Sequence, residues 1–89
     1  SIVPALSATL RDQLLRASSS VVLNVAEGFG CFSRGVKRRH YEIARGSATE
    51  CIAVLDLASV LGHGATLGDT RMLFTRVAMM LAKLVARLR

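Results

Sequence analysis

The stretch Asn24-Val25-Ala26-Glu27-Gly28-Phe29-Gly30 places polar side chains and glycines inside a strongly apolar helical pattern. A second stretch, Ala44-Arg45-Gly46-Ser47, does the same in the segment that follows. A plain helical core would use leucine and alanine at such positions, so the polar groups need partners. We interpret the two stretches as facing parts of one antiparallel helix pair, joined by a turn over residues 28–35.

Helical periodicity extends outward from this pair and predicts an all-α chain, an up-down antiparallel bundle with helices over residues 8–27, 36–61 and 70–88. There is no strand-like alternation, and the only proline is Pro4. Apolar residues recur at three- and four-residue steps in each predicted helix. The first stripe is Leu10, Leu14, Ala17, Val21 and Val25, widened by Leu15, Val22 and Ala26; the second is Tyr41, Ala44, Ala48, Cys51, Leu55 and Ala58; the third is Leu73, Val77, Leu81, Leu84 and Leu88.

Glycines and polar residues mark the expected helix ends. Gly28 lies where a C-terminal cap needs positive φ, and Ser33 leads into the second helix. Residues 62–65, Gly-His-Gly-Ala, should end that helix, and Asp69 should cap the third. Gly28-Phe29-Gly30 is a weak match to a phosphate loop, because no strand precedes it and no Gly-Lys-Ser/Thr follows.

The chain has 89 residues, of which 52% are hydrophobic, yet it contains only one tyrosine and three phenylalanines. So much apolar content in one small domain, residues 1–89, predicts either oligomerisation or a missing part of the core. No apolar run approaches the roughly 20 residues of a membrane span, and the start has no basic leader typical of a signal peptide. Cys31 and Cys51 indicate a reduced, cytoplasmic protein, with a disulfide between them as the alternative.

Gln13, Arg16, Ser20, Asn24 and Glu27 fall on one stripe of the first predicted helix. An antiparallel partner brings polar residues of the second helix to the same height. We interpret the set as an internal hydrogen-bond and ion-pair network that fixes helix register. The predicted structural network is Gln13, Arg16, Asn24, Glu27, Gly28, Arg45, Gly46, Ser47 and Glu50.

Catalytic and metal chemistry find little support in the pattern. Glu27 and Glu42 are the candidates for an acid and base pair, but no nucleophile or cleft-forming loop accompanies them. His40 near Glu42, and His63 between glycines, lack the Glu-x-x-His spacing of metal-binding bundles. We therefore expect no enzyme activity, no metal and no cofactor.

The formal net charge of +6 indicates an anionic partner if the basic groups cluster in space. Arg34, Lys37, Arg38 and Arg39 crowd the start of the second predicted helix, where the helix dipole disfavours cations, so we interpret them as a phosphate site. Arg76, Lys83 and Arg87 form a stripe on the third helix, for which a merely solvated face is the alternative. With so few aromatic residues, recognition would be directed at the nucleic-acid backbone.

The segments Gln13-Leu14-Leu15-Arg16-Ala17, Asn24-Val25-Ala26-Glu27-Gly28 and Ala44-Arg45-Gly46-Ser47 with Glu50 resemble a known family over about residues 10–61. Its founding members are bacterial four-helix-bundle proteins encoded in intervening sequences of large-subunit ribosomal RNA genes. Cys31 and Val36 depart from it, since relatives carry a basic and a polar residue there.

The resemblance implies a further helix at the N-terminus, with residues 1–6 as its last turn and connection, so that the complete protein would be a four-helix bundle. Relatives are similar to the accessory variability determinant of diversity-generating retroelements, a pentameric ring that works with a reverse transcriptase and its RNA. We therefore expect a homo-oligomer, as a pentamer, that binds structured RNA or other nucleic acid and does not engage membranes. The alternative is a structural or protein-interaction scaffold, for example for a nucleic-acid enzyme.

Overall fold

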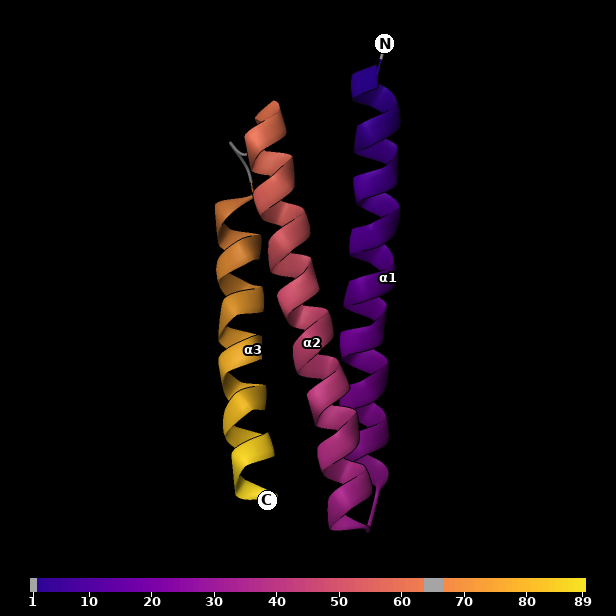
Figure 1. The fold of residues 1–89 in the computed structure, drawn as a ribbon, viewed down its shortest axis with the longest axis vertical. Helices are drawn as coiled ribbons and strands as arrows, with labels where there is room; N and C mark the ends of the chain where they lie inside the picture. The colour runs from indigo at the N-terminus through magenta and orange to yellow at the C-terminus, as the bar shows by residue number, and fades with distance from the viewer. Residues whose placement is uncertain (1, 64–66) are drawn as a thin grey trace.

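The computed structural model describes residues 2–63 and 67–89, with side chains for residues 8–62 and 67–89. The described parts contain α1 (Ile2–Gly30), α2 (Arg34–Ala58), the π-helical segment η1 (Ser59–His63) and α3 (Gly68–Arg87), and no strand. Successive helices run in opposite directions, which confirms the all-α, up-down antiparallel prediction (Figure 1). The expected extra helix in a complete protein stays a prediction.

α2 is the central helix of a single layer (Figure 1). It packs on α1 along one flank and on α3 along the other, while no Cα atoms of α1 and α3 come within 8 Å of each other in the described ranges. All six positions of the stripe predicted for α2 are buried, and three small ones, Ala44, Ala48 and Cys51, are 0% exposed. Small side chains on both flanks let the neighbouring helices approach closely.

Gly28 lies close against α2, and its role differs from the predicted one. Gly28 is not a cap with positive φ; it lies within α1, and among the described residues it is Gly62 that has positive φ. A Cβ atom at Gly28 would stand 2.7 Å from Cε1 of Tyr41 and 3.2 Å from Cβ of His40. Tyr41 also belongs to a core cluster with Ala44, Leu81 and Val85, so its ring joins α1 to both other helices.

Of three predictions at the helix ends, the one for Ser33 is confirmed and the other two are wrong. Residues 2–6 continue α1 without a break and do not form a separate turn and connection, since Pro4 is tolerated in a first helical turn. Ser33 caps α2, accepting a 3.4 Å hydrogen bond from the backbone N–H of Val36. Asp69 is not the cap of α3: Leu67 holds that place without a side-chain bond, and Asp69 lies in the first turn, where its charge favours the dipole.

At the end of the second helix, the prediction of a terminating glycine is confirmed at Gly62, whose φ is 95°. The remaining residues predicted to form that turn, Gly64 and Ala65, lie outside the described residues.

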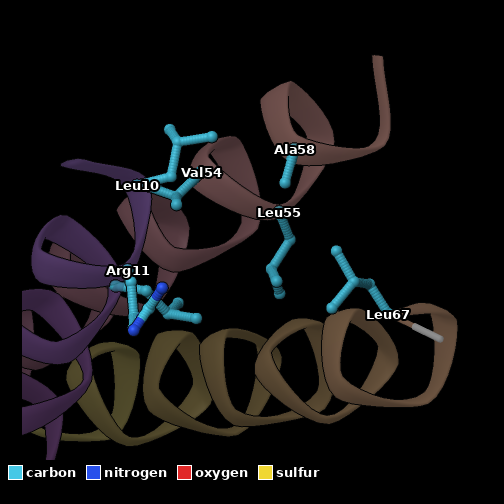
Figure 2. Close-up of a pocket in the computed structure, with 7 residues that line it drawn as sticks. Leu10, Arg11, Val54, Leu55, Ala58 and Leu67 are labelled. Atoms are coloured by element: carbon cyan, nitrogen blue, oxygen red, sulfur yellow. The ribbon is translucent and has the colours of Figure 1, made fainter. Parts of the chain in front are cut away.

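Two open cavities lined mainly by apolar side chains, which we call the apolar trough, lie among the helices. The first, near the α1–α2 turn, has a volume of about 580 Å³ and is lined by Val21, Val22, Val25, Ala26 and Phe29 of α1 and by Val77, Met80, Leu81 and Leu84 of α3. A second open cavity, of about 220 Å³, lies towards the other end, where side chains of all three helical regions meet (Figure 2). It is lined by Leu10, Arg11, Leu14, Val54, Leu55, Ala58 and Leu67.

The position of each outer helix beside α2 alone explains which predicted core residues are not buried. Leu10, Ala17 and Val21 of α1 are buried against α2, whereas Val22 is 67% exposed and Val25 is 36% exposed. On α3, Leu81 is buried, but the predicted core residue Leu73 is 57% exposed. Each outer helix has one helical neighbour instead of two, so the flank of its apolar stripe that faces the trough lacks a partner.

We predict that Gly28→Ala destabilises the fold by about 1–3 kcal/mol, because the added methyl group overlaps the buried Tyr41 ring. The control is Gly46→Ala, at an exposed helical position with nothing within 4 Å, which should stabilise by about 0.5–1 kcal/mol through helix propensity. Urea unfolding measures both changes. Equal effects at the two glycines would contradict the close approach at Tyr41.

Candidate nucleic-acid interface

The basic cluster at the start of α2 is partly occupied by structural contacts. Arg34 donates hydrogen bonds from Nε to the carbonyl oxygen of Leu88, at 3.2 Å, and from Nη2 to that of Arg87. These carbonyls end α3, where unsatisfied oxygens and the helix dipole favour a cation. Arg34 therefore ties the N-terminal end of α2 to the C-terminal end of α3.

Lys37 serves the end of α1 in the same way. Its Nζ donates a 3.4 Å hydrogen bond to the carbonyl oxygen of Phe29 and lies 5.9 Å from the centre of the Phe29 ring. The cations that looked misplaced at the N-terminus of α2 thus stabilise the C-terminal ends of its two neighbours. These contacts form only when the helices are packed together, so the residue pattern of α2 alone does not predict them.

The other two cations of the cluster are more available. Arg38 lies 3.6 Å from the carboxylate of Glu42 in an exposed i,i+4 pair, which holds it weakly. Arg39 is exposed and belongs to neither of the two ion pairs found among the described residues. Of the four predicted phosphate ligands, the structure leaves Arg39 free and Arg38 loosely paired.

The stripe of Arg76, Lys83 and Arg87 is brought together as predicted on the outer side of α3, away from the buried Leu81 and Val85. All three side chains are exposed, and no ion pair of the described chain includes them. After Asp69 the chain contains no acidic residue. The stripe is therefore an uncompensated positive surface.

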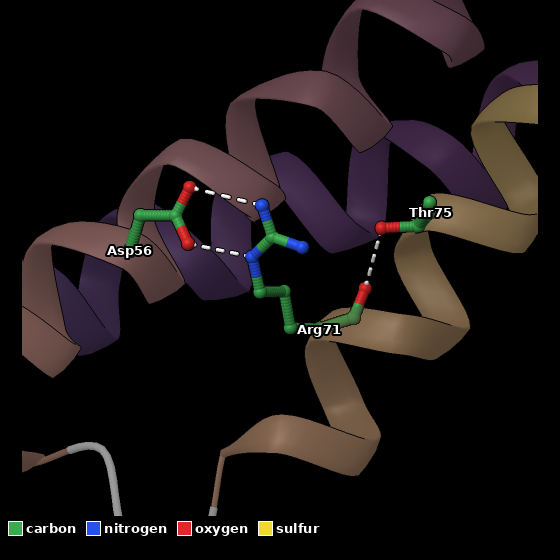
Figure 3. A network of polar contacts seen from close by, with 3 residues as sticks. All are labelled: Asp56, Arg71 and Thr75. Carbon is green, nitrogen blue, oxygen red and sulfur yellow. Dashed lines mark hydrogen bonds and ion pairs between the residues drawn. The ribbon is translucent and has the colours of Figure 1, made fainter.

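Arg71 is basic but engaged, at the opposite end of α3 from Arg87. Its Nε donates to Oδ1 of Asp56 at 2.6 Å and its Nη2 to Oδ2 at 3.3 Å, while its backbone oxygen accepts from Thr75 (Figure 3). The hydrogen bond and charge of Arg71 hold the pKa of the Asp56 carboxyl below its usual value, and Asp56 in turn raises the pKa of Arg71. This pair links α2 to α3 and removes Arg71 from the candidate interface.

A polar seam joins α1 to α2 on part of the predicted network. Ser20 and Ser47 share a 2.8 Å hydrogen bond between their hydroxyls, and Asn24 Nδ2 donates to the backbone oxygen of Ser20 at 2.9 Å. Oδ1 of Asn24 lies 3.0 Å from Nδ1 of His40. Because the Asn24 oxygen can only accept, His40 Nδ1 carries the proton in this contact.

The seam is narrower than the predicted network. Asn24 and Ser47 take part in it, together with Ser20 and with His40, which was not among the predicted network residues. Glu27 and Arg45 are both exposed, and no ion pair joins them in the described structure. No described polar or charged residue is buried, so the seam is half-exposed instead of internal. The placement of His40 opposite Asn24 depends on how α1 and α2 cross, and the residue pattern of a single helix does not predict that crossing.

The remaining network residues fall into two settings. Gly28 packs against Tyr41, whereas Gly46 is exposed with open space around it. Gln13, Arg16 and Glu50 are exposed and line an open cleft of about 310 Å³ beside the Ser20–Ser47 bond. This polar cleft, defined by Gln13, Arg16, Ala17, Ser20, Ser47 and Glu50, lies between α1 and α2.

Neither cysteine is in a disulfide. Burial, with a smaller contribution from the Glu50 carboxylate, holds the pKa of the Cys51 thiol above its ordinary value, so this thiol is a protonated core group at neutral pH. Across the described residues, no three His, Cys, Asp or Glu side chains come together as metal ligands would. In the same ranges, no helix combines the length and the apolar character needed to cross a bilayer.

A protein-family model described as 23S rRNA-intervening sequence protein matches residues 5–83, which is most of the chain. No curated protein and no solved structure matches this chain. The match extends on both sides of the segment, residues 10–61, that carried the resemblance in the sequence.

We predict that Asp56→Asn lowers the thermal midpoint at neutral pH and that the difference from the unchanged protein disappears in acid. A carboxyl whose folded pKa is lowered stabilises the fold above its unfolded value of about 3.9 and loses that contribution as the pH falls through the folded pKa. Circular-dichroism melts over a pH series measure the effect. Asp12→Asn, at an exposed position outside both ion pairs, is the control. A pH-independent loss in Asp56→Asn would contradict the assignment.

Proposed function

The chain belongs to the 23S rRNA-intervening sequence protein family, and we propose that it is a non-enzymatic, homo-oligomeric helical bundle that binds structured RNA through its basic surfaces. The family description refers to a location within ribosomal RNA genes and specifies no ligand. Support for RNA as the ligand therefore comes from charge and its placement. The net charge of +6 on 89 residues favours a polyanion as partner.

The observation that carries the proposal is the stripe of Arg76, Lys83 and Arg87. Three exposed cations on one helix face that belong to no ion pair of the described structure produce a positive potential that reaches into solvent. Long, flexible basic side chains of this kind contact phosphates and release counterions without reading base sequence. Arg39 and, in competition with Glu42, Arg38 add positive charge on α2.

The turn between α1 and α2 supplies a second kind of contact. Phe32 is fully exposed there, at 104% of its reference area, whereas Phe29, which is 80% exposed, also lines the apolar trough. An exposed aromatic ring beside cations can stack on an unpaired base of an RNA loop. Helical RNA with loops or bulges suits this combination better than a continuous duplex does.

A purely structural or protein-interaction scaffold is the second candidate, and the apolar trough favours it. Monomeric soluble proteins rarely leave a long apolar groove open, so the trough supports association of some kind. We propose that copies of this chain associate through it, as a pentamer by similarity to the accessory protein of diversity-generating retroelements. A nucleic-acid enzyme is a further candidate partner for such an assembly.

We predict that the protein binds an RNA hairpin and that the logarithm of its affinity falls linearly with the logarithm of the salt concentration. Replacing Arg76, Lys83 and Arg87 by Ala, one at a time, should weaken binding and reduce the salt slope by roughly one per contact. Fluorescence anisotropy with a labelled hairpin, titrated at several salt concentrations, gives both quantities.

The matched control is Arg45→Ala, which removes the same charge from an exposed position of α2 that does not line the trough and belongs to neither ion pair. It should change the salt slope less than each α3 substitution. No detectable binding at low salt, or an unchanged affinity in the triple α3 variant, would leave the scaffold as the better description.

We predict a solution mass several times the 9.5 kDa of one chain, and about 47 kDa for a pentamer. Val22→Asp, which places a charge in the trough, should lower the mass, because an unpaired carboxylate is costly in an apolar interface. Light scattering coupled to size exclusion measures it. Ala53→Asp, on the exposed side of α2, serves as the control. A monomer at micromolar concentration would count against the oligomer.

A further inference from the structure

The polar cleft between α1 and α2 has the size and the chemistry of a small binding site. Its volume is about 310 Å³, at the lower end of the range for ligand sites. Ala17 is buried there, and the bonded hydroxyls of Ser20 and Ser47 bridge the two helices. The cleft belongs to neither the trough nor the α3 stripe, since none of its residues lines the trough and all lie on α1 and α2.

Opposite charges border this cleft without satisfying each other. Arg16 comes from α1 and Glu50 from α2, and the described structure contains no ion pair for either residue. Elsewhere the same chain pairs Arg38 with Glu42 and Arg71 with Asp56. Arg16 and Glu50 are therefore free to act on one ligand together, one as a donor and the other as an acceptor.

The serine pair leaves a donor for the same ligand. Two hydroxyls have two protons, and a single hydrogen bond between Ser20 and Ser47 uses one of them. Asn24 Nδ2 donates a further bond, of 3.2 Å, to the Ser20 hydroxyl oxygen, so that oxygen is already an acceptor. One hydroxyl proton remains for an acceptor that enters the cleft, and the Gln13 amide beside it can donate or accept.

These groups select the chemistry of the ligand. Glu50 repels a simple anion and Arg16 repels a simple cation, whereas a molecule with an anionic group beside a hydroxyl satisfies both residues. A ribose phosphate has this pattern: Arg16 and the free serine proton suit the phosphate oxygens, and Glu50 accepts from a sugar hydroxyl. The net charge of +6 favours a polyanion that contains this unit over a free zwitterion.

We propose that the polar cleft binds one ribose-phosphate unit of RNA and discriminates RNA from DNA through a hydrogen bond from the 2′-hydroxyl to Glu50. The inference rests on the proposed RNA-binding function and adds a site and a selectivity to it. The negative charge of Glu50 lowers the affinity of the cleft for phosphate. The same carboxylate favours a sugar that has a 2′-hydroxyl over a sugar that lacks it. Only the 2′-hydroxyl distinguishes an RNA backbone from a DNA backbone at a single site.

The test compares one RNA hairpin with the same hairpin carrying 2′-fluoro riboses, which keep the A-form geometry but cannot donate a hydrogen bond. The unchanged protein should bind the hydroxyl form roughly tenfold more tightly, as expected for a hydrogen bond to a charged acceptor. In Glu50→Ala this ratio should fall towards one, while affinity for both hairpins stays the same or rises because a negative charge is lost. Arg16→Ala should weaken binding of both hairpins.

Glu27→Ala is the matched control, because Glu27 is an exposed, unpaired glutamate of α1 that does not line the cleft. It should leave the ratio unchanged. Equal binding of the two hairpins by the unchanged protein, or an unaltered ratio in Glu50→Ala, would overturn the cleft assignment while the proposed RNA binding stands. Absence of binding to either hairpin would overturn both proposals. Uridine monophosphate that binds as tightly as the hairpin would assign the cleft to a free nucleotide and overturn it as an RNA site.

Discussion

The small-residue stripe of α2 is the constraint on which the rest of this fold depends. Ala44, Ala48 and Cys51 are entirely enclosed, and the adjoining Tyr41 ring lies against a glycine of α1 and a cluster on α3. A large side chain at any of these positions would push one outer helix away, since a close-packed interior has no spare volume. The polar seam and the helix-end contacts of Arg34 and Lys37 both require this spacing.

The same constraint creates the apolar trough. A helix layer with α2 in the middle buries both flanks of α2 but only one flank of α1 and one of α3. The opposite flanks remain apolar because the sequence continues their stripes, as in Val22 and Leu73. Domains are normally built from at least two packed layers, so the open flanks favour the proposed association of copies of this chain.

Much of this architecture is predictable from the sequence, because helix periodicity is a local property. Every residue of the α2 stripe was predicted correctly, since that helix has neighbours on both flanks. Failures occur where the outcome depends on a neighbour. Gly28 has the sequence signature of a cap, yet the Tyr41 ring determines its role. His40 contacts Asn24 because of the register in which α1 packs against α2. The spacing of residues within either helix does not determine that register.

The distribution of charge shows why a basic cluster in a sequence is an incomplete guide to a nucleic-acid surface. Of the 12 Lys and Arg residues, Arg34, Lys37, Arg38 and Arg71 have acceptors within the chain. A cation against helix carbonyls or a carboxylate has its field largely compensated, so it attracts a phosphate less strongly than a free cation does. The densest run of basic residues therefore contributes less outward potential than its composition implies, and the sparser stripe on α3 contributes all of its charge. Where helices end close together, positive residues stabilise those ends first, and only the remaining cations are available for the proposed contact with RNA.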